Sequence, residues 1–183
     1  MDAEDVVLGI VSAFDGEVPG RTYLQKVAYF VGRKLGLRLG FSPHYYGPYS
    51  RVITAETEAQ VAAGRLSEES ATFAGSGAGA GPFERVRCTY SLTEGGQRYL
   101  DHVRALDDGE LEALVQTVNR IRETQANYQQ LSCAAKLDYL LEEAGGRISR
   151  EAAVSEAKKL GWDITQVDID AAIRVLQRLD LVR

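Results

Sequence analysis

The residue types that most often carry catalysis are few in this chain, and they form no recognisable motif. The 183-residue sequence holds two histidines, His44 and His102, and two cysteines, Cys88 and Cys133. Neither histidine has a metal-ligand neighbour at a typical spacing, and no nucleophile elbow, paired-carboxylate motif or Cys/His cluster is present. We therefore expect a protein that is not an enzyme and that holds no metal.

One glycine-rich stretch superficially matches a dinucleotide-binding fingerprint. It runs from Gly75 to Ala80 with glycine at every second position. Such a fingerprint requires a strand before it and the start of a helix after it, whereas here Pro82 and a predicted strand follow. We expect a loop at this place and no nucleotide or other cofactor.

Basic and polar residues offer binding chemistry instead, and they concentrate on residues 20–30 and 44–50 and on the segments that follow. Arginine and lysine contact phosphates, while glutamine, serine and threonine hydrogen bond to bases or to a peptide. The candidate binding residues are Arg21, Gln25, Lys26, Arg33, Tyr49, Ser50, Arg51, Thr54, Arg85 and Arg87. They predict one basic surface for double-stranded DNA or for a protein partner. The alternative interpretation is that these are ordinary solvated charges.

The second stretch is also rich in aromatic residues. Tyr45, Tyr46 and Tyr49 surround the dipeptide Gly47-Pro48, which restricts the backbone. One interpretation is that the rings pack in a corner between two helices. The other is that Tyr49, Ser50, Gln25 and Lys26 form one polar patch for a phosphate or a partner peptide at the start of a helix.

Composition and charge limit the possible partners. The net charge is -5 and hydrophobic residues make up 45% of the chain, so DNA binding would need a local basic patch. No apolar run reaches the length of a membrane span, and the acidic N-terminus lacks the pattern of a secretory signal. Two unpatterned cysteines suit a reducing compartment, and we expect a cytoplasmic protein.

Hydrophobic periodicity predicts the elements that must position these residues. The predicted helices span residues 3–14, 22–36, 50–63, 93–106, 110–126, 132–144, 150–160 and 165–179. A strand is predicted at 41–46, and a hairpin pairs residues 65–67 with 84–92. The third helix has a thin apolar stripe of small residues that we expect to face the core: Val52, Ala55, Ala59 and Ala62.

This order predicts a mostly α fold with a small antiparallel β wing. Residues 1–106 are expected to form a winged helix-turn-helix domain, residues 107–130 a connecting helix, and residues 131–183 a tri-helical, helix-turn-helix-like module. The apolar face of the connecting helix could pack within the chain or against a second copy. Because regulators of this kind are commonly two-fold dimers, we expect a homodimer.

Two motifs carry a resemblance to a known family. At Gly-Arg-Thr-x-Leu-Gln-Lys (20–26) and Tyr-Gly-Pro-Tyr-Ser (46–50) the sequence resembles the YwgA-like family of small bacterial winged-helix proteins, and the likeness extends through the hairpin to Gly96. More loosely it is similar to Panacea-type antitoxin domains and to PadR- and MarR-type regulators. The resemblance covers most of residues 1–105. It implies a winged-helix fold and a regulatory, defence-linked or antitoxin-like role.

Two hypotheses for function follow. The first is a non-enzymatic regulator that binds DNA through the basic surface of residues 21–65 and the wing. The second is a protein-interaction adaptor or antitoxin-like module that does not bind DNA, which suits the acidic net charge and the glutamates of the third helix. Only the first predicts binding to random duplex DNA that weakens steeply with salt.

Overall fold

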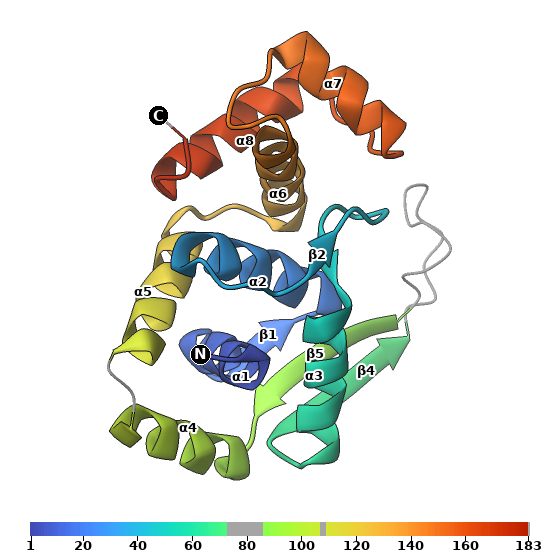
Figure 1. The fold of residues 1–183 in the computed structure, drawn as a ribbon. Coiled ribbons are helices and arrows are strands. Elements are labelled where there is room, and N and C mark those ends of the chain that lie inside the picture. The colour runs from blue at the N-terminus through green and yellow to red at the C-terminus, as the bar shows by residue number, and fades with distance from the viewer. Residues whose placement is uncertain (73–85, 107–108, 183) are drawn as a thin grey trace.

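The computed structural model describes residues 1–72, 86–106 and 109–182, and within them the chain is mostly helical (Figure 1). The helices are α1 (Ala3–Ala13), α2 (Arg21–Leu35), α3 (Arg51–Ala62), α4 (Glu94–Leu106), α5 (Glu110–Glu123), α6 (Tyr128–Glu143), α7 (Arg150–Lys159) and α8 (Gln166–Arg178). The strands are β1 (Glu17–Pro19), β2 (Phe41–Ser42), β3 (Tyr49–Ser50), β4 (Leu66–Thr72) and β5 (Val86–Leu92). The prediction of a mostly α fold with a small antiparallel sheet is confirmed.

The larger sheet contains one strand that the sequence pattern did not predict. Its order is β1-β5-β4, and both pairs are antiparallel. Residues 17–19 were expected to be part of a turn, but Val18 is buried and stands opposite Tyr90 of β5. A strand of three residues is too short to show an alternating pattern. The predicted glycine loop at 75–80 lies outside the described residues.

Other predicted boundaries of strands and helices differ from the observed ones, because local hydrogen bonds determine where these elements begin and end. The predicted strand at 41–46 is only two residues long, and a turn separates β2 from β3. Helix α6 begins at Tyr128 rather than at Ser132, because Asn127 and Gln130 form a reciprocal capping box.

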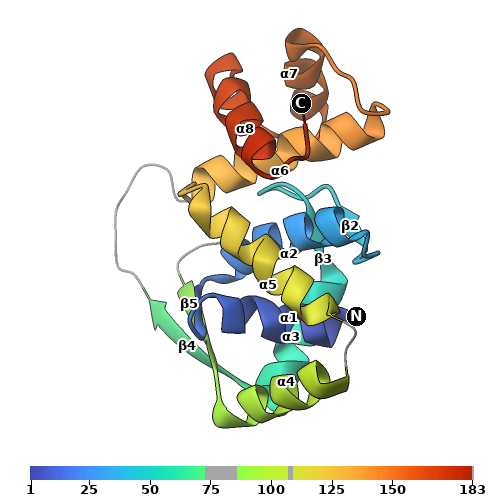
Figure 2. The same cartoon turned by 90° about the vertical axis from the view of Figure 1, so that its left-hand side faces the viewer.

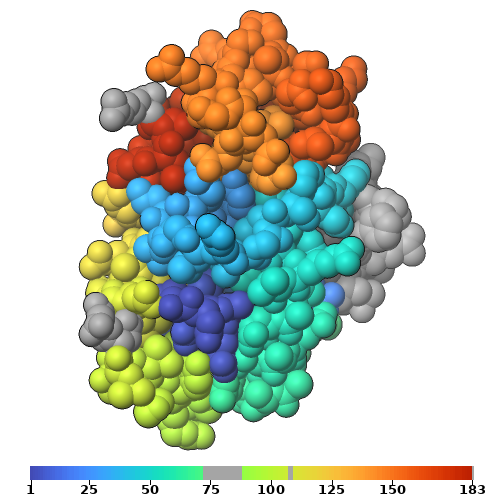
Figure 3. Space-filling model, in the orientation of Figure 1, coloured from blue at the N-terminus to red at the C-terminus, as the bar shows by residue number. Residues whose placement is uncertain are grey.

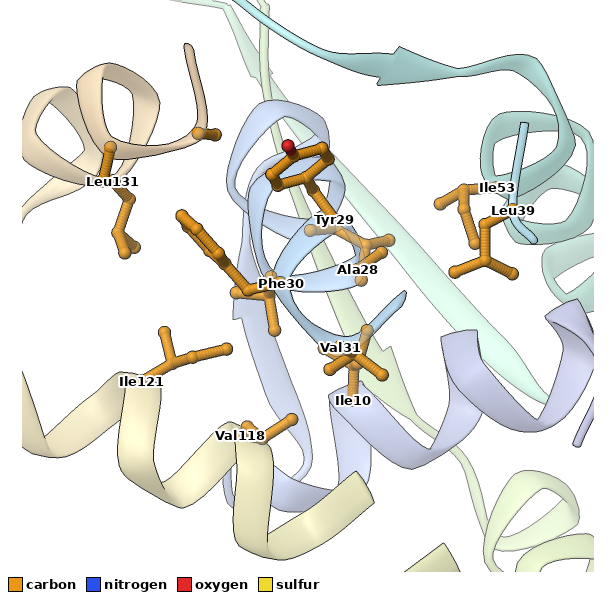
Figure 4. Packing of buried hydrophobic residues seen from close by; sticks show 14 of the residues in the cluster. Ile10, Ala28, Tyr29, Phe30, Val31, Leu39, Ile53, Val118, Ile121 and Leu131 are labelled. Carbon is orange, nitrogen blue, oxygen red and sulfur yellow. The ribbon is translucent and has the colours of Figure 1, made fainter. Parts of the chain in front are cut away.

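Helix α2 lies at the centre of the core. Every residue from Leu24 to Gly32 is buried, although only one apolar stripe was predicted. Figure 4 shows why: side chains from α1, α3, α5 and α6 surround this helix, and Phe30 lies toward Ile121 of α5 and Leu131 of α6. A helix covered on several sides must also bury its polar residues, and each of those needs a hydrogen-bond partner.

The apolar face of α5 packs within the chain, which settles the two alternatives for the connecting helix. Leu111, Leu114, Val118 and Ile121 are buried, and the helix lies against α1 and α2. Figure 2 shows α6 beside α2, with α7 and α8 on the far side of α6. The buried residues of α6–α8 continue those of the first five helices in one hydrophobic cluster.

One glycine of α4 permits the close approach of the residue before β4 to this helix, and it supports a stability prediction. A Cβ atom at Gly96 would lie 2.6 Å from Leu92 Cδ1 and closer still to the carbonyl oxygen of Arg65. We expect Gly96→Ala to lower the free energy of unfolding by about 1–3 kcal/mol, although alanine favours helices. Chemical denaturation measures the change.

The adjacent glycine provides the control. At Gly95 the added Cβ would meet Gly64 O and Thr93 Oγ1 at 3.4 Å each, which is ordinary contact. Gly95→Ala should leave stability unchanged or raise it by up to about 1 kcal/mol. Equal losses for both variants would contradict the close approach described here.

Candidate functional site

The segment from His44 to Ser50 joins the N-terminal half of the chain to the C-terminal helices. Three alternate carbonyl oxygens of this segment each accept a hydrogen bond from a side chain of a different element. Trp162 Nε1, between α7 and α8, donates to His44 O at 2.6 Å, and Ser132 Oγ of α6 donates to Tyr46 O at 2.7 Å. We call residues 44–50 and the side chains that hold them the joint.

The third carbonyl is held by Lys26 of α2. Its Nζ donates to Pro48 O at 2.7 Å, and the residue is only 1% exposed. Burial, together with the nearby charge of Lys136, lowers the pKa of Lys26 to about 7. Lys136 of α6 is half-buried, and burial also lowers its pKa. Lys26 is therefore part of the interior and is not available to a phosphate at the surface.

Gln25 holds the end of the joint. Its Nε2 donates to Ser50 O and its Oε1 accepts from Ser50 N, both at 2.9 Å, so the amide satisfies both backbone groups of Ser50. Ser50 Oγ in turn accepts from Ile53 N and caps α3, and it donates to Leu39 O. All of these groups are buried. The Leu-Gln-Lys and Tyr-Gly-Pro-Tyr-Ser motifs thus contact each other inside the molecule.

The predicted polar patch is brought together, but most of it faces inward. Of its members, only Tyr49 is half-exposed, and it packs against the ring of His44 with centroids 4.9 Å apart. Thr54 donates to Tyr49 Oη at 2.7 Å and accepts from Gln25. The buried groups therefore do not form an open binding patch, and the rings of the corner-packing interpretation are not buried either, since Tyr45 is 61% exposed.

Arg33, which was predicted to contribute to a basic surface, is engaged by two carboxylates of α6. Its Nε lies 2.6 Å from Asp138 Oδ2, and its Nη2 lies 2.7 Å from Glu142 Oε1. The side chain of Asp138 is 2% exposed and also accepts a hydrogen bond from Tyr29 Oη at 2.8 Å. Burial and the charge of Asp138 raise the pKa of Tyr29, so its hydroxyl stays protonated.

The remaining predicted cations are dispersed. Arg21 is bound to Glu68 Oε1 at 2.9 Å and donates to Tyr90 Oη at 2.9 Å. Arg51 is exposed at the start of α3 and forms no ion pair within the ranges that the structure describes. Arg85 and the side chain of Arg87 lie outside those ranges. Arg51 is therefore the one predicted cation whose charge is seen to be unneutralised at the surface of the described chain.

The outer face of α3 differs from the prediction. The stripe expected to be buried, with Val52 and Ala59 among its members, is exposed, and the core is instead contacted by Ile53, Thr57 and Gln60. The prediction was wrong because the stripe of small residues and the true inner face are both weakly apolar. In Figure 3 this helix forms part of the visible surface.

The sequence analysis missed the residues that bind α2 and the joint from the C-terminal side. Ser132, Asp138 and Trp162 lie more than 80 positions from their partners. Asp138 did leave a signal, because it lies in a helix that is apolar on several faces, where a carboxylate needs a partner. Nothing in the sequence identified which partner that is.

No group of three or more metal-ligating side chains occurs in the part of the chain that the structure describes. None of the helices described there combines the length and apolar character needed to cross a membrane.

Comparison with known proteins gives one informative similarity. No protein-family model matches the chain. Over 106 residues the sequence is 32% identical to the uncharacterized protein YwgA of Bacillus subtilis (strain 168), and the match spans 57% of this chain and 57% of that protein. The chain thus matches little more than half the length of this relative. The similarity supports the resemblance to YwgA-like proteins that the two motifs suggested.

Proposed function

We propose that the protein is a non-enzymatic interaction adaptor built on a winged-helix scaffold. The element order α1-β1-α2-β2-β3-α3-β4-β5, in which β2 and β3 form a separate two-stranded pair, and the sheet order β1-β5-β4 support a winged helix over residues 1–106. Helix α3 is then the helix that would read a DNA groove in a DNA-binding relative of this architecture. The character of its outer face therefore decides between DNA and a protein partner.

The outer face of α3 carries this proposal. Its exposed residues are Arg51, Val52, Ala55, Glu58, Ala59 and Ala62. Beyond Arg51 this face offers methyl groups and a carboxylate, whereas groove and phosphate recognition needs donors. Two predicted cations of α2 do not compensate, because Lys26 is buried and Arg33 is bound to α6. Exposed methyl groups stabilise a contact with another protein when they are removed from water, whereas they contribute nothing to phosphate binding.

DNA binding is the second candidate, and Arg51 is the observation that favours it. Its exposed guanidinium lies at the N-terminus of α3, where both its own charge and the helix dipole favour a phosphate. A single such contact gives weak binding that falls only about three- to fourfold between 50 mM and 200 mM salt.

Fluorescence anisotropy with a labelled 20-base-pair random duplex separates the two candidates. If the protein is an adaptor, we expect no saturable binding at 50 mM salt and no effect of Arg51→Glu. Binding at 50 mM salt that falls at least threefold by 200 mM, and that Arg51→Glu removes, would instead establish the DNA-binding candidate.

A second measurement tests the adaptor directly. Ala59→Arg places a long charged side chain in the middle of the exposed face of α3, and we expect it to abolish capture of a partner from cell extract without changing the melting temperature. Glu112→Arg, at an exposed position of α5, is the matched control and should still capture the partner from the extract. A partner captured equally by both variants would exclude the α3 face as the interface.

A further inference from the structure

The three C-terminal helices surround an open cavity that no proposed role of α3 uses. Its volume is about 980 Å³, near the upper end of the range for ligand pockets. Its apolar walls come from α6, α8, the loop before α7 and the segment after α8. The main wall residues are Leu137, Leu141, Ile148, Ile173, Leu181 and Val182.

The cavity exists because α7 fills little of the space beside α6 and α8. The buried residues of this ten-residue helix are Ala153 and Ala157, whose side chains are too small to fill the space between three helices. Leu141, Ile148 and Ile173 consequently remain half-exposed, although each is packed against the core. Since interiors are normally close-packed, apolar walls left open to this extent favour an apolar occupant.

The charged residues at the edge of the cavity indicate the sign of the charge that its occupant would carry. Asp180 is neutralised by Arg120, and Arg150 lies 2.7 Å from Asp170. Arg147 is exposed and has no ion-pair partner among the residues described. The edge therefore carries one unbalanced positive charge in a chain whose net charge is -5. The N-terminus of α7, capped by Ser149, adds the positive end of a helix dipole on the same side.

We propose that this cavity binds a small anionic amphiphile, with its carboxylate at Arg147. Its apolar chain would lie between α6 and α8, against Leu141 and Ile173. Such a ligand goes beyond the adaptor function, because it makes the chain responsive to a metabolite-sized molecule. It would contact α6, which also supplies Ser132 to the joint, so that binding would alter how firmly the two halves are held.

Decanoate is the probe that tests this site, with 1-decanol as its uncharged counterpart. Isothermal titration of the full chain, below the micelle concentration, should give saturable one-to-one binding of decanoate. Arg147→Gln should weaken decanoate binding about tenfold and leave 1-decanol binding unchanged, because the arginine contacts only the charged group. Ile173→Trp, at a half-exposed position that tolerates a larger side chain, should abolish binding of both probes.

Arg174→Gln is the matched control, since this exposed arginine of α8 does not line the cavity. It should bind decanoate as the unmodified chain does, and circular dichroism should show that all three variants are folded. The proposal is overturned if decanoate does not saturate, if Arg147→Gln and Arg174→Gln behave alike, or if Ile173→Trp still binds. None of these results depends on α3, so the adaptor function can fail while this site is retained.

Discussion

Replacing Asp138 by alanine is expected to lower the free energy of unfolding by about 3 kcal/mol at neutral pH. The substitution leaves Arg33 and the hydroxyl of Tyr29 without their buried acceptor. Removing one partner from a buried ion pair typically costs about 3–5 kcal/mol, because the remaining charge is left uncompensated. Arg33 keeps Glu142 and is partly exposed, which places the expected effect at the lower end of that range.

Glu142→Ala provides the control on the same arginine. Glu142 lies 2.7 Å from Arg33 Nη2, but its side chain is 52% exposed, so its loss should cost no more than about 1 kcal/mol. Chemical denaturation followed by circular dichroism measures both variants. Similar losses for the two carboxylates would show that burial does not strengthen the contact between α2 and α6.

Replacing Lys26 by methionine is expected to change how stability depends on pH. The pKa of Lys26 is about 7 in the folded chain and near 10.5 in the unfolded chain. Between these values the unfolded chain binds more protons than the folded chain, so this lysine makes the free energy of unfolding rise with pH. Below pH 7 both states hold the proton, and the cost of burying the ammonium group is fully present.

The measurable quantity is the stability of the unmodified chain minus that of Lys26→Met. We expect this difference to rise by at least about 2 kcal/mol between pH 7 and pH 9.5, since one pKa unit corresponds to about 1.4 kcal/mol. Its sign at a single pH is less informative, because the variant also leaves Pro48 O unpaired. Lys158→Met, which removes an exposed lysine, is the control. A difference that does not vary with pH would mean that Lys26 keeps its proton in the interior.

If the Lys26 prediction holds, the joint is a structural feature and the two motifs that resemble YwgA have an internal role. Gln25 and Lys26 then hold the backbone of residues 48–50, which in turn positions the start of α3. A surface that recognises a partner would be built on this support, with Arg51 and the outer face of α3 nearest to it.

The sequence by itself determined most helices and the hairpin, because caps and periodicity act within a few residues. Ser50, Ser149 and Thr165 cap helices that begin within one residue of their predicted starts, and Cys88 and Tyr90 are buried as alternate residues of β5. The sequence also identified Gln25 and Lys26 as candidate binding residues and the Gly47-Pro48 dipeptide as a turn.

Only the tertiary structure decided which of these residues face solvent. The apolar stripe of α3 is exposed, whereas Lys26 is buried, because α2 is covered on several sides by helices that are distant in sequence. The partners Ser132, Asp138 and Trp162 were equally unpredictable. Periodicity shows that a helix has an apolar face, but the assignment of a buried donor to its acceptor depends on how separate elements pack.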